Sequence, residues 1–195
     1  MKNIFIDYNG EQFKSRVYLG LLDESHAPFL AQEMNESEMR DYLLSNNFPI
    51  SEKNEVEWVG RLYGPKNNQD VILGIFLKET GQLIGVMSLN KISYIHGTSI
   101  TGAWLGKEFR NNGLGVEAKM LLLDYAFNTL NLRKIQSAVI ATNTRSTDYS
   151  KKCGYKVEAT FPKQIFQKGQ YWDEIFLAVY REDWLPLWEK FIRGS

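Results

Sequence analysis

The chain has 195 residues, of which 44% are hydrophobic and 24% are charged, as is typical of a soluble globular domain with a full core. Lysine plus arginine equals aspartate plus glutamate, 23 against 23, which argues against a general nucleic-acid binder. No apolar run approaches the roughly 18 residues that a membrane span needs. We therefore expect a single domain over 1–195, with neither nucleic acid nor a membrane as its partner.

Cysteine and histidine are too sparse for the usual structural cross-links. Cys153 is the one cysteine, so the chain cannot form an internal disulfide, and a reducing, cytoplasmic setting is expected. The two histidines, His26 and His96, lie far apart in the sequence. This composition argues against a zinc site, and we expect no metal.

The first third of the chain predicts a hairpin, a strand and three helical segments. Asn9-Gly10 stands between two short alternating runs, which indicates a hairpin turn. The strand is expected at 16–22, and the helical segments at 26–35, from Ser37 to a break at Pro49, and at 51–62. Asp23 or Ser25 is expected to cap the first helix, and Ser51 the third.

The rest of the chain alternates strands with two helices and ends in an aromatic-rich helical tail, 181–191. Strands are predicted at 70–80, 83–95, 98–106, 134–142, 155–161 and 171–180. One apolar face predicts a helix about 18 residues long, formed by Val116, Met120, Leu123, Phe127 and Leu130. A short helix is expected at 144–154, ending at Gly154, and 162–170 is interpreted as a loop.

This order of elements predicts a mixed α/β domain. The unit 98–142 is a strand, a helix and a strand. Such a unit needs a right-handed crossover, so its two strands should be parallel or nearly so.

The stretch "RNNGLG", 110–115, precedes the long helix and has the composition of a phosphate cradle. The first N–H groups of a helix have no intrahelical partner and carry partial positive charge, so a phosphate satisfies them. Glycine lets a phosphate approach the backbone, and Arg110 can add a charge-assisted hydrogen bond. Three interpretations compete: a turn without a ligand, a dinucleotide site and a coenzyme A site.

The dinucleotide interpretation fails on context. "GLGVEA" matches the pattern G-x-G-x-x-A. An acidic residue should then follow about 20 residues on, at the end of the next strand. That strand ends Ala141-Thr142-Asn143, without an acid. The G-x-x-x-x-G-K-[ST] loop of nucleoside-triphosphate binders is also absent from the chain.

The loop fits the signature Q/R-x-x-G-x-G/A of the GNAT superfamily of N-acetyltransferases at every fixed position. With "NTRSTDYSKKCGY" and "GQYWDEIFLAVYREDW" further on, the chain resembles the RimJ/RimL-like branch of that superfamily over about 16–183. The N-terminal hairpin, 1–15, and the C-terminal aromatic helical tail, 184–195, lie outside this core. The resemblance implies a single-domain GNAT-like α/β fold. Its mixed, mostly antiparallel sheet would hold a parallel, splayed strand pair around the coenzyme A site.

The resemblance also implies which residues bind coenzyme A. The backbone of the loop would hold the pyrophosphate, through Arg110, Asn111, Asn112, Gly113, Leu114 and Gly115. The pantetheine arm would lie between strands 99–105 and 134–142 and pair with the backbone near Trp104 and Leu105. Asn143 matches a pantetheine contact, although it can also be a helix cap. Lys152 matches a basic position near the nucleotide, although it can equally be a surface lysine.

The chain departs from the family pattern at the catalytic positions. A family tyrosine that protonates the leaving thiolate would fall at Ser150, and Tyr149 is one residue earlier. A family glutamate that acts as base would fall at Ile100. Asp173 is another candidate base. Further carboxylates lie on the early helices, at Glu33, Glu36 and Glu38. Cys153 is expected to serve packing.

The expected function is therefore acetyl-CoA-dependent N-acetyl transfer. A primary amine, on a protein N-terminus or a small molecule, would attack the thioester directly. Alternatives are an aminosugar, polyamine or antibiotic acceptor, or a coenzyme A-binding module without catalysis. We expect the protein to be a monomer or a homodimer with an amine-bearing acceptor as its substrate. The sequence does not identify that acceptor.

Overall fold

The structure is a computed structural model that describes residues 4–10, 13–43, 48–64 and 69–193. Its described strands form one sheet in the order β1-β2-β3-β4-β5-β6-β8-β7. The strands are β1 Ile4–Ile6, β2 Val17–Gly20, β3 Val71–Leu77, β4 Leu83–Ser93, β5 Thr98–Leu105, β6 Lys134–Ile140, β7 Lys156–Gln167 and β8 Gln170–Tyr180. The α-helices are α1 Ala27–Asn35, α2 Ser37–Tyr42, α3 Glu52–Leu62, α4 Leu114–Asp124, α5 Thr144–Lys152 and α6 Arg181–Ile192.

The sheet is antiparallel except at its centre. β5 and β6 run parallel, and their register pairs extend only from Thr98–Lys134 to Ile100–Gln136. Beyond that point each strand stays paired with its outer neighbour, β5 with β4 and β6 with β8. The predicted mixed sheet with one parallel pair is confirmed. The two strands part at Thr101, which opens the middle of the sheet.

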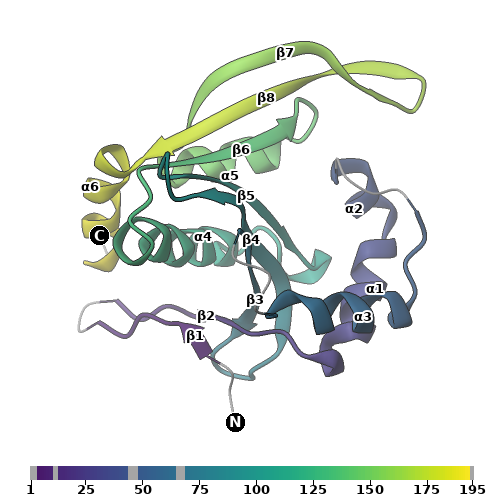
Figure 1. The fold of residues 1–195 in the computed structure, drawn as a ribbon, viewed down its shortest axis with the longest axis horizontal. Coiled ribbons are helices and arrows are strands. Elements are labelled where there is room, and N and C mark those ends of the chain that lie inside the picture. The colour runs from purple at the N-terminus through teal and green to yellow at the C-terminus, as the bar shows by residue number, and fades with distance from the viewer. Residues whose placement is uncertain (1–3, 11–12, 44–47, 65–68, 194–195) are drawn as a thin grey trace.

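Helices cover both faces of this sheet (Figure 1). Successive residues of β2 alternate between them, because strand side chains point to opposite faces. Val17 and Leu19 belong to the core cluster under α4, whereas Tyr18 belongs to the cluster under α1 and α3. Each buried leucine or valine contributes about 1.5–3 kcal/mol of transfer free energy. Both faces of the central strands are therefore held by apolar packing.

The predicted long helix is α4 followed by a π-helical segment, Tyr125–Thr129. Leu121, Leu122 and Leu123 are consecutive and all buried, because α4 packs on more than one side. The sequence pattern predicted this wide apolar arc. It did not predict the π-helical segment or the burial of Lys119 within the same helix.

Two predicted capping residues, Asp23 and Ser51, do cap helical segments, whereas α1, α2, α4 and α6 begin without a side-chain cap. Asp23 accepts a hydrogen bond from Ser25 N at 3.0 Å and caps a short 3₁₀ turn that leads into α1. Ser51 Oγ accepts from Asn54 N at 3.2 Å and caps α3. The second helical segment ends at Tyr42. The helix therefore ends seven residues before Pro49, and the prediction that Pro49 breaks it is wrong; residues 44–47 lie outside the described residues.

The sequence predicts Asn9 in the turn of a hairpin, but in the structure it is a paired residue. Asn9 pairs with Lys14 in an isolated antiparallel bridge. Residues 11–12, between them, lie outside the described residues.

The prediction of a loop at 162–170 is wrong. β7 continues to Gln167 and β8 begins at Gln170, so most of this segment is a paired hairpin. The register shifts between Phe161 and Ile165, a bulge that accommodates Pro162. The turn itself is Lys168-Gly169, where both residues have positive φ. Proline and polar residues indicated a loop locally, whereas pairing with β8 made a strand.

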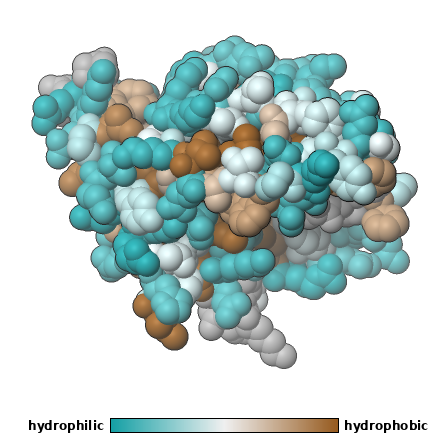
Figure 2. Space-filling view, turned by 90° about the horizontal axis from the view of Figure 1, so that it is seen from above, coloured by the Kyte–Doolittle hydropathy of each residue, from teal (hydrophilic) through white to brown (hydrophobic). Residues whose placement is uncertain are grey.

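This hairpin reaches over the sheet toward α2 (Figure 1). At its tip Lys168 Nζ lies 2.7 Å from Asp41 Oδ2 on α2. Phe166 and Tyr171 are exposed on it. Seen from above in Figure 2, the molecular surface is mainly hydrophilic, and apolar residues form small separate groups. No helix in the described part of the chain is long and apolar enough to cross a membrane.

Candidate functional site

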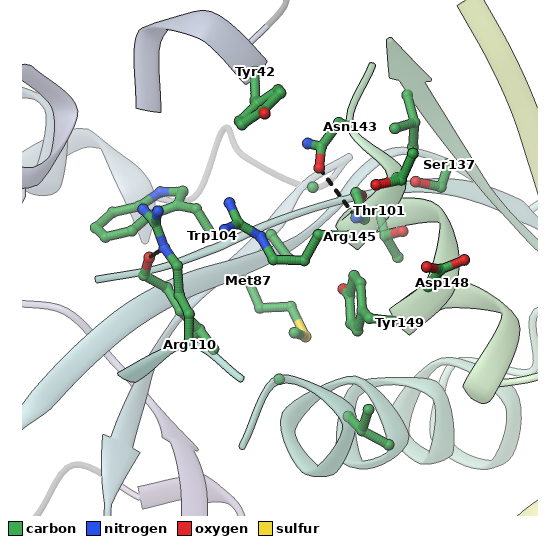
Figure 3. A pocket seen from close by; sticks show the side chains of 18 of the residues that line it. Tyr42, Met87, Thr101, Trp104, Arg110, Ser137, Asn143, Arg145, Asp148 and Tyr149 are labelled. Carbon is green, nitrogen blue, oxygen red and sulfur yellow. Dashed lines mark hydrogen bonds between the residues drawn. The ribbon is translucent and has the colours of Figure 1, made fainter. Parts of the chain in front are cut away.

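A pocket of about 660 Å³ lies where β5 and β6 separate. Its walls are residues 101–105 of β5, residues 137–139 of β6, the loop before α4 and the first turns of α5. α2 contributes Glu38, Met39 and Tyr42 on the remaining side. Figure 3 shows Arg110 approaching from one side and Arg145 and Tyr149 from α5 opposite it. The volume is within the usual range for small-molecule sites, about 300–1,000 Å³.

The loop before α4 is held in a conformation that exposes its backbone. Gly113, the residue directly before α4, has φ +79°, a left-handed conformation that favours glycine. Asn111 is also left-handed, with φ +66°. Arg16 Nη2 donates to the carbonyl of Asn112 at 2.8 Å, and Arg16 Nε donates to buried Glu117 at 2.7 Å. Arg16, directly before β2, therefore fixes the loop from outside the pocket.

Two arginines at the rim of the pocket share one carboxylate. Glu38 Oε1 on α2 lies 3.1 Å from Arg110 Nη1 and 3.0 Å from Arg145 Nη1. Arg110 Nε also donates to the Leu105 carbonyl at 2.8 Å. Partial burial raises the pKa of Glu38, but the hydrogen bond from Arg145 and the charges of both arginines outweigh it, so the net pKa is lowered. This rim, named here the arginine rim, is the part of the pocket best suited to an anion.

The structure brings most of the sequence-predicted site residues to this pocket. Those that line it are Trp104, Leu105, Arg110, Asn111, Gly113, Gly115, Asn143, Tyr149 and Lys152. Four others lie outside its lining. Leu114 is buried in the core, and Asn112 faces Arg16 with its carbonyl. Ser150 is fully buried, and Asp173 Oδ1 accepts from Lys163 N at 2.9 Å in the β7 bulge.

Asn143 caps α5 in this structure. Its Oδ1 accepts a hydrogen bond from Ser146 N at 3.1 Å, and this cap sets the phase of the helix. With that phase Tyr149 faces the pocket and Ser150 faces the interior. Burial raises the pKa of the Tyr149 hydroxyl well above 10, and the charges of Cys153 and Tyr155 add to it. Tyr149 is therefore a poor acid at neutral pH.

Cys153 is packed behind α5, as expected. Its side chain is fully buried, and burial raises the pKa of its thiol to about 12 despite the nearby charge of Lys119. The nucleophile of a thiol is its thiolate. This residue is therefore inert as a nucleophile at neutral pH.

Sequence reasoning missed Thr101, Arg145 and Lys119. Thr101 and Arg145 line the pocket, and Lys119 donates a hydrogen bond to Thr101 from below. A strand threonine and a helix-start arginine are too common to stand out in a sequence. The one available signal was the position of Lys119, which stands inside the apolar run of α4.

Comparisons with known proteins show the family of this chain and proteins that share its fold. A family model described as an acetyltransferase (GNAT) domain matches residues 16–156. Spermidine N(1)-acetyltransferase of Escherichia coli (strain K12) is 28% identical over 105 residues, 54% of this chain and 56% of the relative. The chain thus spans about half the length of the curated relative that it matches.

Two solved structures share the fold. Spermidine N-acetyltransferase of Vibrio cholerae, in complex with CoA and spermine, matches with a TM-score of 0.79 and 22% identity. That match covers 87% of this chain and 98% of the other. The ribosomal L7/L12 alpha-N-protein acetyltransferase RimL, in complex with coenzyme A, has a TM-score of 0.77 and 20% identity. It covers 86% of this chain and 95% of the other.

Proposed function

Because this chain belongs to the acetyltransferase (GNAT) domain family, we propose that it moves an acetyl group from acetyl-CoA to a primary amine. The observation that carries the proposal is the gap between β5 and β6. It leads from a helix N-terminus with left-handed Gly113 into the sheet, where an extended ligand can lie along free strand edges. A phosphate-bearing donor with a long arm fits a site of that shape.

We assign the donor site as follows. The backbone of Arg110 to Gly115 holds the pyrophosphate at the start of α4, where the N–H groups and the helix dipole favour an anion. The pantetheine arm pairs with the exposed edge of β5 near Trp104 and Leu105. Asn143 and Lys152 contact the donor from α5. The acceptor amine attacks the thioester directly, without a covalent intermediate on Cys153.

The acceptor enters from the side of α2. Glu38 and Asp148 contribute carboxylates to the pocket wall, and an acceptor amine is cationic until it loses a proton. We propose a protein N-terminus as the acceptor, in keeping with the RimJ/RimL-like resemblance and the fold shared with RimL. A polyamine is the second candidate, because a relative that is 28% identical is a spermidine acetyltransferase. The single cysteine of this chain, Cys153, fits action in the reducing cytoplasm.

The test is to incubate the purified protein with acetyl-CoA and a panel of amines. The panel contains peptides with free N-termini, spermidine, spermine, aminosugars and amino-bearing antibiotics. Released thiol is followed in time, and acetylated products are identified by mass spectrometry. Thiol release with one amine class supports the transferase. Binding of coenzyme A without thiol release from any amine supports a binding module instead.

The donor assignment has a separate test in Gly113→Asp. The new carboxylate meets the pyrophosphate, so the affinity for coenzyme A should fall at least tenfold, or about 1.4 kcal/mol. Gly169→Asp is the matched control, because Gly169 also has positive φ, +74°, but lies at the tip of the β7–β8 hairpin. Affinity is measured by isothermal titration calorimetry. Equal losses in both variants would mean that backbone strain, and not the cradle, causes the effect.

A further inference from the structure

Lys119 is a cation in the interior of the protein. Its side chain is 1% exposed, and it belongs to the largest fully buried side chains of the molecule. Among the described residues, no carboxylate forms an ion pair with it. A buried ammonium without a carboxylate is costly, because burial removes its hydration and returns no opposite charge. Because this burial lowers the stability of the fold, we expect Lys119 to have a functional role.

A small polar network holds the ammonium group. Lys119 Nζ donates to Thr101 Oγ1 at 2.9 Å. The rings of Tyr149 and Tyr155 lie 5.2 Å and 5.1 Å from Nζ, within the range of cation–π attraction. Thr101 Oγ1 in turn donates to the Gln136 carbonyl at 3.2 Å and lies 3.3 Å from Tyr155 Oη. The rings of Tyr149 and Tyr155 thus stabilise the ammonium charge, which donates its hydrogen bond to the Thr101 hydroxyl.

That hydroxyl is at the inner end of the pocket. Thr101 is the first residue of β5 after its last register pair with β6, so it marks the point where the strands part. Thr101 and Tyr149 both line the pocket (Figure 3). A donor whose phosphates lie at the loop before α4 must extend its other end inward along β5. Its sulfur therefore comes to the Thr101 side.

We propose, on the premise of the function proposed above, that Lys119 is a positioning residue that acts through the Thr101 hydroxyl on the sulfur of coenzyme A. It stabilises the thiolate that leaves and supplies the proton that this thiolate takes up. Neither the family signature nor the spacing of residues in the sequence assigns this role to Lys119.

The proton and electron balance is simple. The acceptor nitrogen forms a bond to the carbonyl carbon, and the carbon–sulfur bond breaks with its electron pair on sulfur. The Thr101 hydroxyl gives its proton to the sulfur and takes one from Lys119 Nζ. Lys119 is left as a neutral amine, and the proton that the acceptor loses restores its charge through solvent. A hydroxyl both donates and accepts, so Thr101 can relay in this way when its hydrogen turns from the Gln136 carbonyl to the sulfur.

The charge state of Lys119 suits this task. Burial lowers the pKa of its ammonium to about 8, although the neighbouring Cys153 raises it slightly. An ordinary thiol has a pKa near 8.5, so donor and acceptor are closely matched. The titratable groups that face Lys119 are Tyr149 on α5 and, after the end of that helix, Cys153 and Tyr155. Burial raises the pKa of each of the three, so they stay neutral at pH 8.

The test uses coenzyme A itself and does not depend on the acceptor. The pKa of the bound thiol is measured by the ultraviolet absorbance of the thiolate, as a difference against the protein alone between pH 6 and pH 10. In wild type we expect a thiol pKa about one unit lower than in Lys119→Met, which is a tenfold difference in thiolate at the same pH. Thr101→Val should raise the thiol pKa in the same direction but by less, because the charge remains.

Lys134→Met is the matched control, because Lys134 also lies over a tyrosine ring, Tyr180 at 5.2 Å, but pairs with Glu158 outside the pocket. It should leave the thiol pKa unchanged. Thermal unfolding checks that each variant folds. An identical thiol pKa in wild type, Lys119→Met and Thr101→Val would overturn the inference and leave Lys119 a structural residue. Failure of wild type to bind coenzyme A would overturn the proposed function, and this inference with it.

Discussion

Two groups of cationic side chains, one at the rim of the pocket and one behind its inner end, are neutralised in different ways. At the arginine rim, Arg110 and Arg145 share the carboxylate of Glu38, whose side chain is 40% exposed. At the inner end, Lys119 is buried and is balanced by two aromatic rings and the hydroxyl of Thr101. One site is an ion-pair network in which Glu38 and Arg145 are exposed and Arg110 is mostly buried, and the other is a lone charge in the interior.

The difference follows from the dielectric around each site. Water and salt screen the more exposed pair, Glu38 with Arg145, so under the proposed function a donor phosphate can compete with Glu38 for the arginines. Inside the protein the same charge acts more strongly, but it also loses hydration, which lowers the pKa of Lys119. The rim is therefore suited to affinity for an anionic donor, and the inner site to chemistry at one atom.

The largest expected effect is on stability, in Lys119→Met. The native ammonium has its pKa lowered to about 8 from 10.5, so the unfolded chain binds more protons between these pH values. The buried charge then destabilises the native state fully below pH 8. Its removal should raise the free energy of unfolding at pH 7 by up to about 3 kcal/mol.

The sign of the pH dependence tests this explanation. Wild-type stability should rise from pH 8 toward pH 10.5 as Lys119 loses its proton, so the advantage of Lys119→Met should shrink over this range. Urea unfolding of both proteins at pH 7 and pH 9.5 measures the difference in their free energies of unfolding. An advantage that is the same at both pH values would mean that packing, and not charge, separates the two proteins.

A smaller effect is expected at the rim, in Arg110→Gln. Loss of a charge-assisted contact should weaken coenzyme A binding about tenfold in isothermal titration calorimetry. The matched control is Arg133→Gln, because Arg133 Nε also donates to a backbone carbonyl, that of His96 at 2.8 Å, away from the pocket. If the two variants bind equally well, Arg110 does not contact the donor.

The smallest effect is expected in Glu38→Gln. Removal of the carboxylate frees Arg110 and Arg145, so coenzyme A should bind about two- to threefold more tightly at low salt. The gain should disappear in high salt, because the competition is between screened charges. Weaker binding of this variant would instead show that Glu38 holds the arginines in the geometry that the donor needs.

The donor half of the candidate site could be predicted from the sequence because its signals are local. Gly113 needs a left-handed backbone, the helix begins directly after it, and Asn143 begins the next one. The catalytic half could not be predicted in the same way. Counting from Asn143 pointed to Ser150, yet the structure turns that residue inward and brings Tyr149 to the pocket wall.

By itself, the sequence determined the order of the elements, the apolar faces of α4 and β2 and the glycine loop, because each depends on residues a few positions apart. Tertiary structure decided the rest. It paired 162–167 into β7 despite Pro162, and it closed α5 over α4 so that Lys119, a residue type that normally faces solvent, became buried. The physical reason is that strand pairing and burial depend on segments far apart in the chain.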